Sequence, residues 1–157
     1  MDQSSLQKFV DEAMIRNVIA RYADVATRAD YESFHSLWTD EGEFIIGEAP
    51  KEHHATGPAD TVALFRKLRA NKTFFVQFAL PGVIDIDGDE ATTRTFIHES
   101  TQGPDETYYR CHCIAFDRLQ RSGENWLFRS RSFQYLWLDT GAFSGNGFPL
   151  FPTGSGN

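Results

Sequence analysis

Cysteine is scarce in this sequence, and the two cysteines present exclude a disulfide framework. Cys111 and Cys113 lie two residues apart in a run typical of a strand, so their side chains share one face. A redox or metal pair would need a turn between the sulfurs and further ligands nearby. The spacing therefore predicts two buried free thiols.

Clustered positive charge and long apolar runs are also missing. The formal net charge of -7 argues against a nucleic-acid partner, which needs grouped lysines and arginines. No segment approaches the roughly 20 apolar residues of a membrane span, and the N-terminus lacks the basic and apolar regions of a leader peptide. We expect a soluble, cytoplasmic protein that binds neither nucleic acid nor a membrane.

Motifs for metals and phosphates are lacking as well. His53 and His54 are adjacent, but no paired carboxylate motif accompanies them. The run Gly145-Asn146-Gly147 does not lie between a strand and a helix, where a phosphate-binding loop would be. We therefore expect no metal and no cofactor.

Aromatic residues are abundant. Fourteen phenylalanines in 157 residues indicate a largely aromatic interior, and the length fits one domain over residues 1–157. The tail, residues 139–157, is rich in Gly and Pro yet keeps four large apolar groups: Phe143, Phe148, Leu150 and Phe151. It is either a strap over the cavity mouth or a partner subunit, or a frayed end.

Helical patterns come first along the chain. Apolar residues recur at helical spacing over residues 6–26. Asp30 fits the N-cap of a short second helix that continues through Trp38 and closes at residues 40–42. Pro58 suits the first turn of a third helix, after a polar loop that holds Pro50 and the two histidines.

Strand patterns dominate afterwards, with predicted strands at 44–46, 73–79, 83–86, 91–99, 106–119 and 126–138. Asp87-Gly88-Asp89 and the run at 122–124 supply hairpin turns. Helices followed by strands predict an α+β fold, in which the helices pack on the concave face of a strongly bent antiparallel sheet. The bend leaves an apolar cavity for a small organic molecule.

The pattern of Ile15, Ala20-Arg21-Tyr22, Asp30, Phe34, Leu37, Trp38 and Asp40, with the late Trp126, resembles the SnoaL-like branch of the nuclear transport factor 2-like superfamily. The resemblance covers nearly the whole chain. It implies a cone-shaped α+β fold, a homodimer or homotrimer, and relatives that include ketosteroid isomerases, polyketide cyclases, scytalone-type dehydratases and a hexachlorocyclohexane dehydrochlorinase. Most of these enzymes need no cofactor, because they move a proton inside an apolar pocket.

The resemblance suggests three catalytic residues. Tyr22 matches the first-helix tyrosine that donates to the oxyanion in ketosteroid isomerases, although a tyrosine on an apolar helix stripe can be simply core. His112 falls where those enzymes hold a protonated aspartate and could be a general base near neutral pH, or a core or interface histidine. Arg131 resembles the last-strand arginine of the dehydrochlorinase, or it pairs with a carboxylate such as Glu99.

Strand alternation extends this site. It places Arg129, Arg131, Phe133, Tyr135 and Trp137 on one face of the last strand, and Tyr108, Arg110 and His112 together on the strand before it. His98 is predicted to point away from the cavity, toward the convex face or a partner subunit. The predicted substrate-binding residues are Phe44, Ile46, Phe65, Tyr108, Arg110, Phe133 and Tyr135.

The sequence also departs from these relatives. Their aspartate–histidine dyad aligns with Thr27 and Val76, and the isomerase's proton-shuttling aspartate aligns with Ile46. Our hypothesis is a cofactor-independent lyase or isomerase that acts by proton transfer on an aromatic or polycyclic molecule, through dehydration, isomerisation, cyclisation or retro-aldol cleavage. The alternative is a non-catalytic small-ligand-binding or assembly domain of the same fold.

Overall fold

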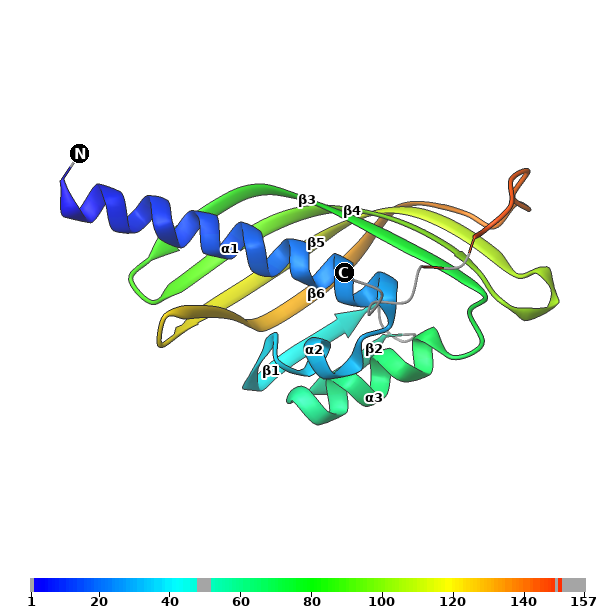
Figure 1. Cartoon of the computed structure of the whole chain (residues 1–157), viewed down its shortest axis with the longest axis horizontal. Coiled ribbons are helices and arrows are strands. Elements are labelled where there is room, and N and C mark those ends of the chain that lie inside the picture. The colour runs from blue at the N-terminus through cyan, green and yellow to red at the C-terminus, as the bar shows by residue number, and fades with distance from the viewer. Residues whose placement is uncertain (1, 48–51, 149, 151–157) are drawn as a thin grey trace, which may run out of the picture.

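The computed structural model describes residues 2–47, 52–148 and 150. Within these residues, three α-helices pack on one face of a curved, open six-stranded sheet (Figure 1). The strand order is β2-β1-β6-β5-β4-β3, and every neighbouring pair is antiparallel except β1 and β6, which are parallel. The predicted α+β fold is confirmed, with a mixed rather than purely antiparallel sheet.

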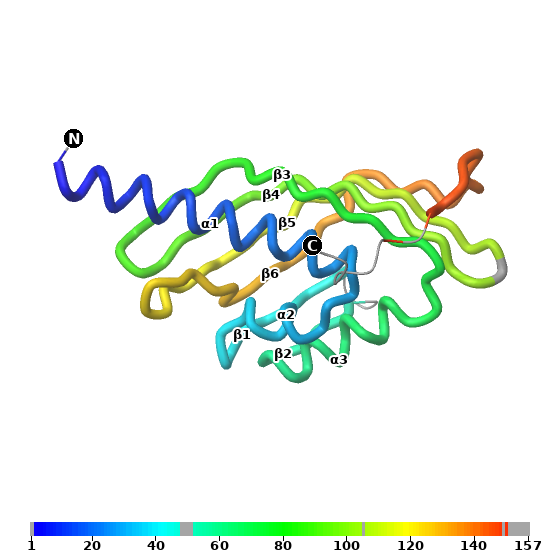
Figure 2. The backbone as a smooth tube through the Cα atoms, in the orientation of Figure 1, coloured from blue at the N-terminus to red at the C-terminus, as the bar shows by residue number. Residues whose placement is uncertain are grey.

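Helix α1 (Gln3–Arg28) covers the long strands β3 to β6, as the backbone trace in Figure 2 shows. It begins at Asp2, whose carboxylate accepts from the backbone N–H of Ser5, and ends at Ala29 in a left-handed conformation. Its buried stripe recurs every three or four residues and includes Ile15, Ile19 and Tyr22. No described helix combines the length and apolarity that crossing a bilayer requires.

Helix α2 (Tyr31–His35) and helix α3 (Pro58–Arg69) lie beside β1. The predicted cap is confirmed, because the Asp30 carboxylate accepts from the N–H of Ser33 at 3.1 Å, and Pro58 occupies the first helical turn. The prediction that the second helix continues through Trp38 is wrong. The N–H of Phe128 donates to the carbonyl of Leu37 at 2.8 Å, so β6 draws this segment into the sheet.

The first two strands are β1 (Trp38–Ile46) and β2 (His53–Thr56). Strand β2 replaces the end of the predicted polar loop, because its residues pair antiparallel with residues 43–46 of β1. Pro50, which that loop was predicted to hold, lies outside the described residues.

The remaining strands are β3 (Phe74–Asp87), β4 (Glu90–Gln102), β5 (Tyr108–Ser122) and β6 (Asn125–Asp139), with a short 3-10 turn, Pro104–Glu106, between β4 and β5. Strand β3 continues through the predicted break at Leu80-Pro81-Gly82, where the pairing register only shifts. Gly88 and Gly123 have positive φ in the two hairpin turns, a conformation that favours glycine.

Two register shifts in β6 change which side chains face the helices. Between Phe128 and Ser130, and again between Tyr135 and Trp137, β6 holds one residue more than β5. Each extra residue inverts the alternation of the strand. The predicted common face is therefore wrong: Arg131, Phe133 and Tyr135 point toward the helices, whereas Arg129 and Trp137 do not.

The core is aromatic, as predicted. The ring of Tyr22 lies 5.3 Å from that of Phe34, 5.7 Å from that of Phe128 and 6.3 Å from those of Phe44 and Phe133, measured between centroids. Edge-to-face contacts of this kind add to the free energy of aromatic burial. Cys111 and Cys113 are buried free thiols, which confirms that prediction.

The tail folds back over the sheet near the start of β5. The ring of Phe143 lies 5.0 Å from that of Tyr108 and 6.2 Å from that of Phe74. Phe148 and Leu150 are exposed, and Phe151 lies outside the described residues. Of the apolar groups of the predicted strap, Phe143 therefore makes contact with the body of the domain.

Candidate functional site

A cavity of about 390 Å³ lies between the helices and the inner face of the sheet. Helices α1 and α3 and strands β1 to β6 all contribute to its wall. This volume falls within the range of small-molecule sites. Much of the wall is apolar or aromatic. Its polar lining residues are His53, Arg69, Lys72, Gln77, Glu99, Tyr108, Tyr109, Tyr135 and Thr140.

Six of the seven predicted substrate-binding residues line this cavity: Phe44, Ile46, Phe65, Tyr108, Phe133 and Tyr135. The seventh, Arg110, does not. Its guanidinium pairs with Asp139 and lies over the ring of Phe143, 5.2 Å from the centroid. The cavity placement predicted for Arg110 is therefore wrong, because alternation along β5 turns its side chain away from the helices.

Tyr22 lines the cavity from the buried face of α1. Burial raises the pKa of the phenol far above its usual value, so the hydroxyl remains protonated and can only donate or accept a hydrogen bond. The guanidinium carbon of Arg131 lies 4.1 Å from the ring centroid of Tyr22. This cation–π contact stabilises the position of the Tyr22 ring.

Arg131 is fully buried and does not line the cavity. Its Nε lies 3.0 Å from Oδ1 of Asp117, and Thr93 and Thr95 donate to Oδ2 of the same carboxylate. Asp117, not Glu99, is therefore the partner of this arginine. The arrangement is a buried ion pair, the alternative left open by the sequence, in which Nη1 of Arg131 has no hydrogen-bond partner among the described residues.

His112 lies on the outer face of the sheet. Its Nδ1 is 3.3 Å from Nδ1 of His98, and its ring centroid is 5.2 Å from that of Trp137. The prediction that His112 shares the cavity with Tyr22 and Arg131 is wrong, because β5 points its odd-numbered residues from 111 to 119 toward the helices. The outward placement predicted for His98 is confirmed.

Glu99, which the sequence suggested only as a carboxylate partner for Arg131, lines the cavity. Its side chain reaches into the cavity from the middle of the sheet, between β3 and β5. Gln77 Nε2 donates to Oε2 at 2.7 Å, and the hydroxyl of Tyr109 donates to Oε1 in a very close contact. The carboxyl is thus held in one orientation by a donor from each side.

The surroundings of Glu99 act on its pKa in opposite directions. Burial raises the pKa above the usual value, while the hydrogen bonds from Tyr109 and Gln77 and the charges of Arg69 and Lys72 lower it. Burial is the largest of these effects. A carboxyl whose pKa is raised is a stronger base than a carboxyl in water, which favours a role as general base.

A set of contacts at the end of α1 fixes this part of the wall. The hydroxyl of Thr27 accepts from the backbone N–H of Gln77 at 3.1 Å, next to the glutamine that orients Glu99. Arg69 donates through Nε to the carbonyl of Ala26 and through Nη2 to that of Thr27, both at 3.3 Å. Thr27, which aligns with the catalytic aspartate of the relatives, thus joins a helix to a strand in this chain.

Two signals in the sequence could have identified this cluster. Because His98 was expected to face outward, the next residue, Glu99, had to face inward. The two cysteines at 111 and 113 share one face of a strand, and if that face is buried, then Tyr109 lies on it as well. The alignment from the resemblance favoured the opposite face of β5 and therefore hid Tyr109.

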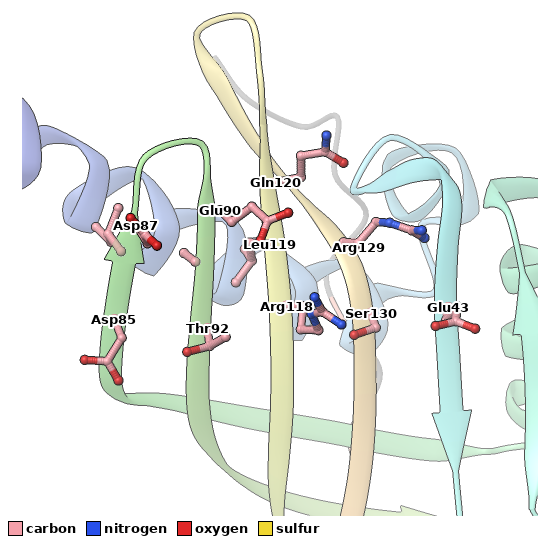
Figure 3. Close-up of a pocket in the computed structure, with 12 residues that line it drawn as sticks. Glu43, Asp85, Asp87, Glu90, Thr92, Arg118, Leu119, Gln120, Arg129 and Ser130 are labelled. Atoms are coloured by element: carbon pink, nitrogen blue, oxygen red, sulfur yellow. The ribbon is translucent and has the colours of Figure 1, made fainter.

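A second hollow, of about 480 Å³, lies over the ends of β1 and β3 to β6 (Figure 3). Charged side chains of both signs surround it: Glu43, Asp85, Asp87, Glu90, Arg118 and Arg129. None of its lining side chains is a buried polar group without a partner, among the residues that the structure describes. In that part of the chain no three metal-ligating groups come together either. This hollow is a solvated surface.

The fold is an open, curved sheet covered by helices, with a largely apolar cavity between them. The SnoaL-like domain model matches residues 7–132, and the chain belongs to this family. No curated protein matches it by sequence.

Several solved structures share the fold. A hexachlorocyclohexane dehydrochlorinase, LinA type 2, is 12% identical with a TM-score of 0.80, covering 96% of this chain and 99% of the other. A candidate scytalone dehydratase from Novosphingobium aromaticivorans is 15% identical with a TM-score of 0.77, covering 98% and 99%. An NTF2-like protein with a cystatin-like fold from the same organism is 25% identical with a TM-score of 0.71, covering 85% and 86%.

Proposed function

We propose that this protein is a cofactor-independent lyase or isomerase that moves a proton on an aromatic or polycyclic small molecule, with Glu99 as the general base. The observation that carries the proposal is the carboxyl of Glu99, buried in the cavity wall and oriented by Gln77 and Tyr109. A carboxylate held in place in a water-poor cavity is effective at accepting a proton from carbon.

The chemistry follows from this placement. The carboxylate of Glu99 takes a proton from a substrate carbon next to a carbonyl, and the C–H electron pair forms a carbon–carbon double bond as negative charge moves to the carbonyl oxygen. In a lyase the charge then returns and expels a leaving group from the neighbouring carbon. In an isomerase a different carbon takes the proton back from Glu99.

Tyr22 is the proposed donor to the developing oxyanion. Tyr22 lines the cavity, and its hydroxyl stays protonated because burial keeps its pKa high. Arg131 acts through Tyr22 as a positioning residue, since its guanidinium packs beneath the ring and lies outside the cavity. His112 has no part in this mechanism.

The walls and the structural relatives support the substrate class and the reaction type. Phe44, Phe65, Phe75 and Phe133 surround the cavity, and aromatic rings favour flat apolar ligands. Two of the similar structures are described as a dehydrochlorinase and a candidate dehydratase, names that denote elimination reactions. Both lines favour proton abstraction followed by elimination.

The test is proton exchange at carbon. The protein is incubated in deuterium oxide with a panel of aromatic ketones and β-hydroxy ketones, and deuterium uptake and elimination are followed by NMR. We expect turnover of at least one compound by the wild type, a loss of about a hundredfold or more in Glu99→Gln, and no change in Glu124→Gln, a surface control in the β5–β6 turn. Full activity of Glu99→Gln would refute the assignment.

One observation favours assembly as a second function. The outer face of β3 to β6 exposes a group of large apolar side chains, which we call the outer patch: Phe78, Leu80, Phe96, Phe116 and Trp137, each more than two-fifths exposed. Such a surface is typical of an interface. Charges of both signs border the patch, Asp85 on one strand and Arg94 and Arg118 on the next two, so two copies related by a twofold axis would be complementary.

We propose a second copy of this chain as the occupant of the outer patch. Sedimentation velocity should show a dimer for the wild type and a monomer for Phe96→Lys. Phe148→Ser, which changes an exposed side chain of the tail, should leave the dimer intact. A monomeric wild type at micromolar concentration would refute this second proposal.

A further inference from the structure

Two cationic side chains line the cavity beside Glu99. Arg69 is the last residue of α3, and Lys72 follows in the turn that leads into β3, where its N–H donates to the carbonyl of Arg69 at 3.2 Å. Within the described residues, neither side chain lies within 4.0 Å of a carboxylate oxygen. Among the described residues that line the cavity, Arg69 and Lys72 thus face one carboxylate, that of Glu99.

Arg69 is fixed in position. Two of its nitrogens donate to the last carbonyls of α1, and the guanidinium lies 4.4 Å from the ring centroid of Phe75, another cavity residue. The side chain is only partly exposed, and burial lowers its pKa. A cation that has lost part of its hydration gains more from an anionic partner than a free surface cation does.

Lys72 lies on the same side of the cavity. Its Nζ is 5.6 Å from the ring centroid of Tyr109, the residue whose hydroxyl donates to Glu99. The two cations and the proposed base therefore line the same cavity, and aromatic side chains such as Phe44 of β1 and Phe133 of β6 also line it. A ligand that matches both kinds of side chain carries a negative group at one end and an aromatic skeleton at the other.

We propose that the cavity selects aromatic carboxylic acids, whose carboxylate binds to Arg69 and Lys72 while the ring enters the aromatic interior. This inference rests on the proposed function for its catalytic meaning, because the bound acid would present a carbon near its carboxylate to Glu99. The binding itself does not depend on turnover. The anionic site is local, since the chain as a whole carries a formal charge of -7.

The two cations also couple binding to the base. Their charges lower the pKa of Glu99 in the empty cavity. A bound carboxylate offsets those charges, so the pKa of Glu99 rises and its carboxylate becomes the stronger base when the substrate is present. A neutral ligand of the same shape does not offset the two charges and therefore does not raise the pKa of Glu99 in this way.

The test compares 2-naphthoate with its neutral isostere 2-naphthamide by isothermal titration calorimetry on the full chain. We expect the wild type to bind the naphthoate about tenfold more tightly or better, as one charge-assisted contact provides. Lys72→Met should remove most of that preference. Lys67→Met, an exposed lysine on α3 that does not line the cavity, should retain it.

Salt provides a second measurement. Raising the ionic strength should weaken the binding of naphthoate and leave that of naphthamide nearly unchanged. Equal affinities for the two ligands in the wild type, or an undiminished preference in Lys72→Met, would overturn the proposal.

Glu99→Gln separates this inference from the proposed function. If Glu99 is the base, the variant loses turnover but still prefers naphthoate, because both cations remain. Retained turnover in Glu99→Gln refutes the catalytic assignment alone. If the wild type binds naphthoate no more tightly than naphthamide, the anionic site alone is refuted.

Discussion

Asp11 of α1 and Arg121 near the end of β5 form a two-point ion pair, with Nη1 2.6 Å from Oδ1 and Nη2 2.7 Å from Oδ2. The indole N–H of Trp126 donates to the same carboxylate at 3.2 Å. The side chain of Asp11 is only 4% exposed, so water screens the pair weakly. This contact fastens the first helix to the β5–β6 hairpin.

Replacing Asp11 should destabilise the protein in a pH-dependent way. The Arg121 guanidinium lowers the pKa of Asp11 from its ordinary 3.8 to about 2, which corresponds to roughly 2 kcal/mol of folding free energy. Because the folded-state pKa is depressed, this contribution is present above pH 3.8 and is lost as the pH falls toward 2. Urea unfolding of Asp11→Asn at pH 7 should show the deficit.

The matched control is Glu12→Gln, which changes the next residue, an exposed carboxylate paired only with Arg16. Its free energy of unfolding should differ from that of the wild type by less than about 0.5 kcal/mol. A gap between Asp11→Asn and the wild type that is as large at pH 2 as at pH 7 would contradict the ion-pair account.

Turnover should depend on the protonation of Glu99. Because burial raises the pKa of this carboxyl, kcat/KM should fall as the pH drops through a value above its ordinary 4.5. The hydrogen bond from Tyr109 lowers that pKa, so Tyr109→Phe should move the profile to higher pH. The pH dependence of kcat/KM measures both.

Tyr108→Phe is the control for this profile. The Tyr108 hydroxyl also belongs to a cavity residue, but its hydrogen bond is with Gln102 and not with Glu99. Its profile should coincide with that of the wild type. A shift of the Tyr109→Phe profile toward lower pH would show that the hydroxyl stabilises the protonated carboxyl instead.

Arg131→Met should destabilise the fold strongly, by about 3 to 5 kcal/mol, because it leaves the carboxylate of Asp117 buried without its cation. The double variant Arg131→Met/Asp117→Asn should recover most of this loss, since a neutral amide still accepts hydrogen bonds from Thr93 and Thr95. The free energies of unfolding of the wild type, the single variant and the double variant, measured by chemical denaturation, test this prediction. Equal stability of the single and double variants would argue against a buried ion pair.

His112→Asn should leave turnover within about twofold of the wild type, because the imidazole lies on the outer face, beside His98 and Trp137. Steady-state kinetics on any substrate that Glu99 serves would measure this. A loss comparable to that of Glu99→Gln would mean that the outer face takes part in the reaction.

The sequence predicts local features of this fold well. The periodicity of α1, the cap at Asp30, the proline at the start of α3 and the glycines of the hairpin turns each depend on a few neighbouring residues, and all are present. The end of α2 was misplaced because its outcome depends on a distant strand. Trp38 has a helical neighbourhood in sequence, yet Phe128 of β6 binds the adjacent carbonyl.

The candidate site was harder to predict for a related reason. Alternation along a strand gives the relative orientation of its residues, but one fixed point is needed to decide which set faces inward. The resemblance supplied a fixed point for β5 that was displaced by one residue, so His112 was placed inside and Tyr109 was missed. The two bulges of β6 have no glycine or proline to mark them at Arg129 and Leu136.

The parallel pairing of β1 with β6 has a consequence for biogenesis. Phe44 pairs with Arg131, so β1 can pair with β6 only after β2 to β5 have been synthesised. The β3–β6 meander, built from hairpins of nearby residues, can form before that ordering step. Until the sheet has formed, the apolar faces of helices α1 to α3 remain exposed to solvent. Aggregation is therefore most favoured before the N-terminal helices pack on the sheet.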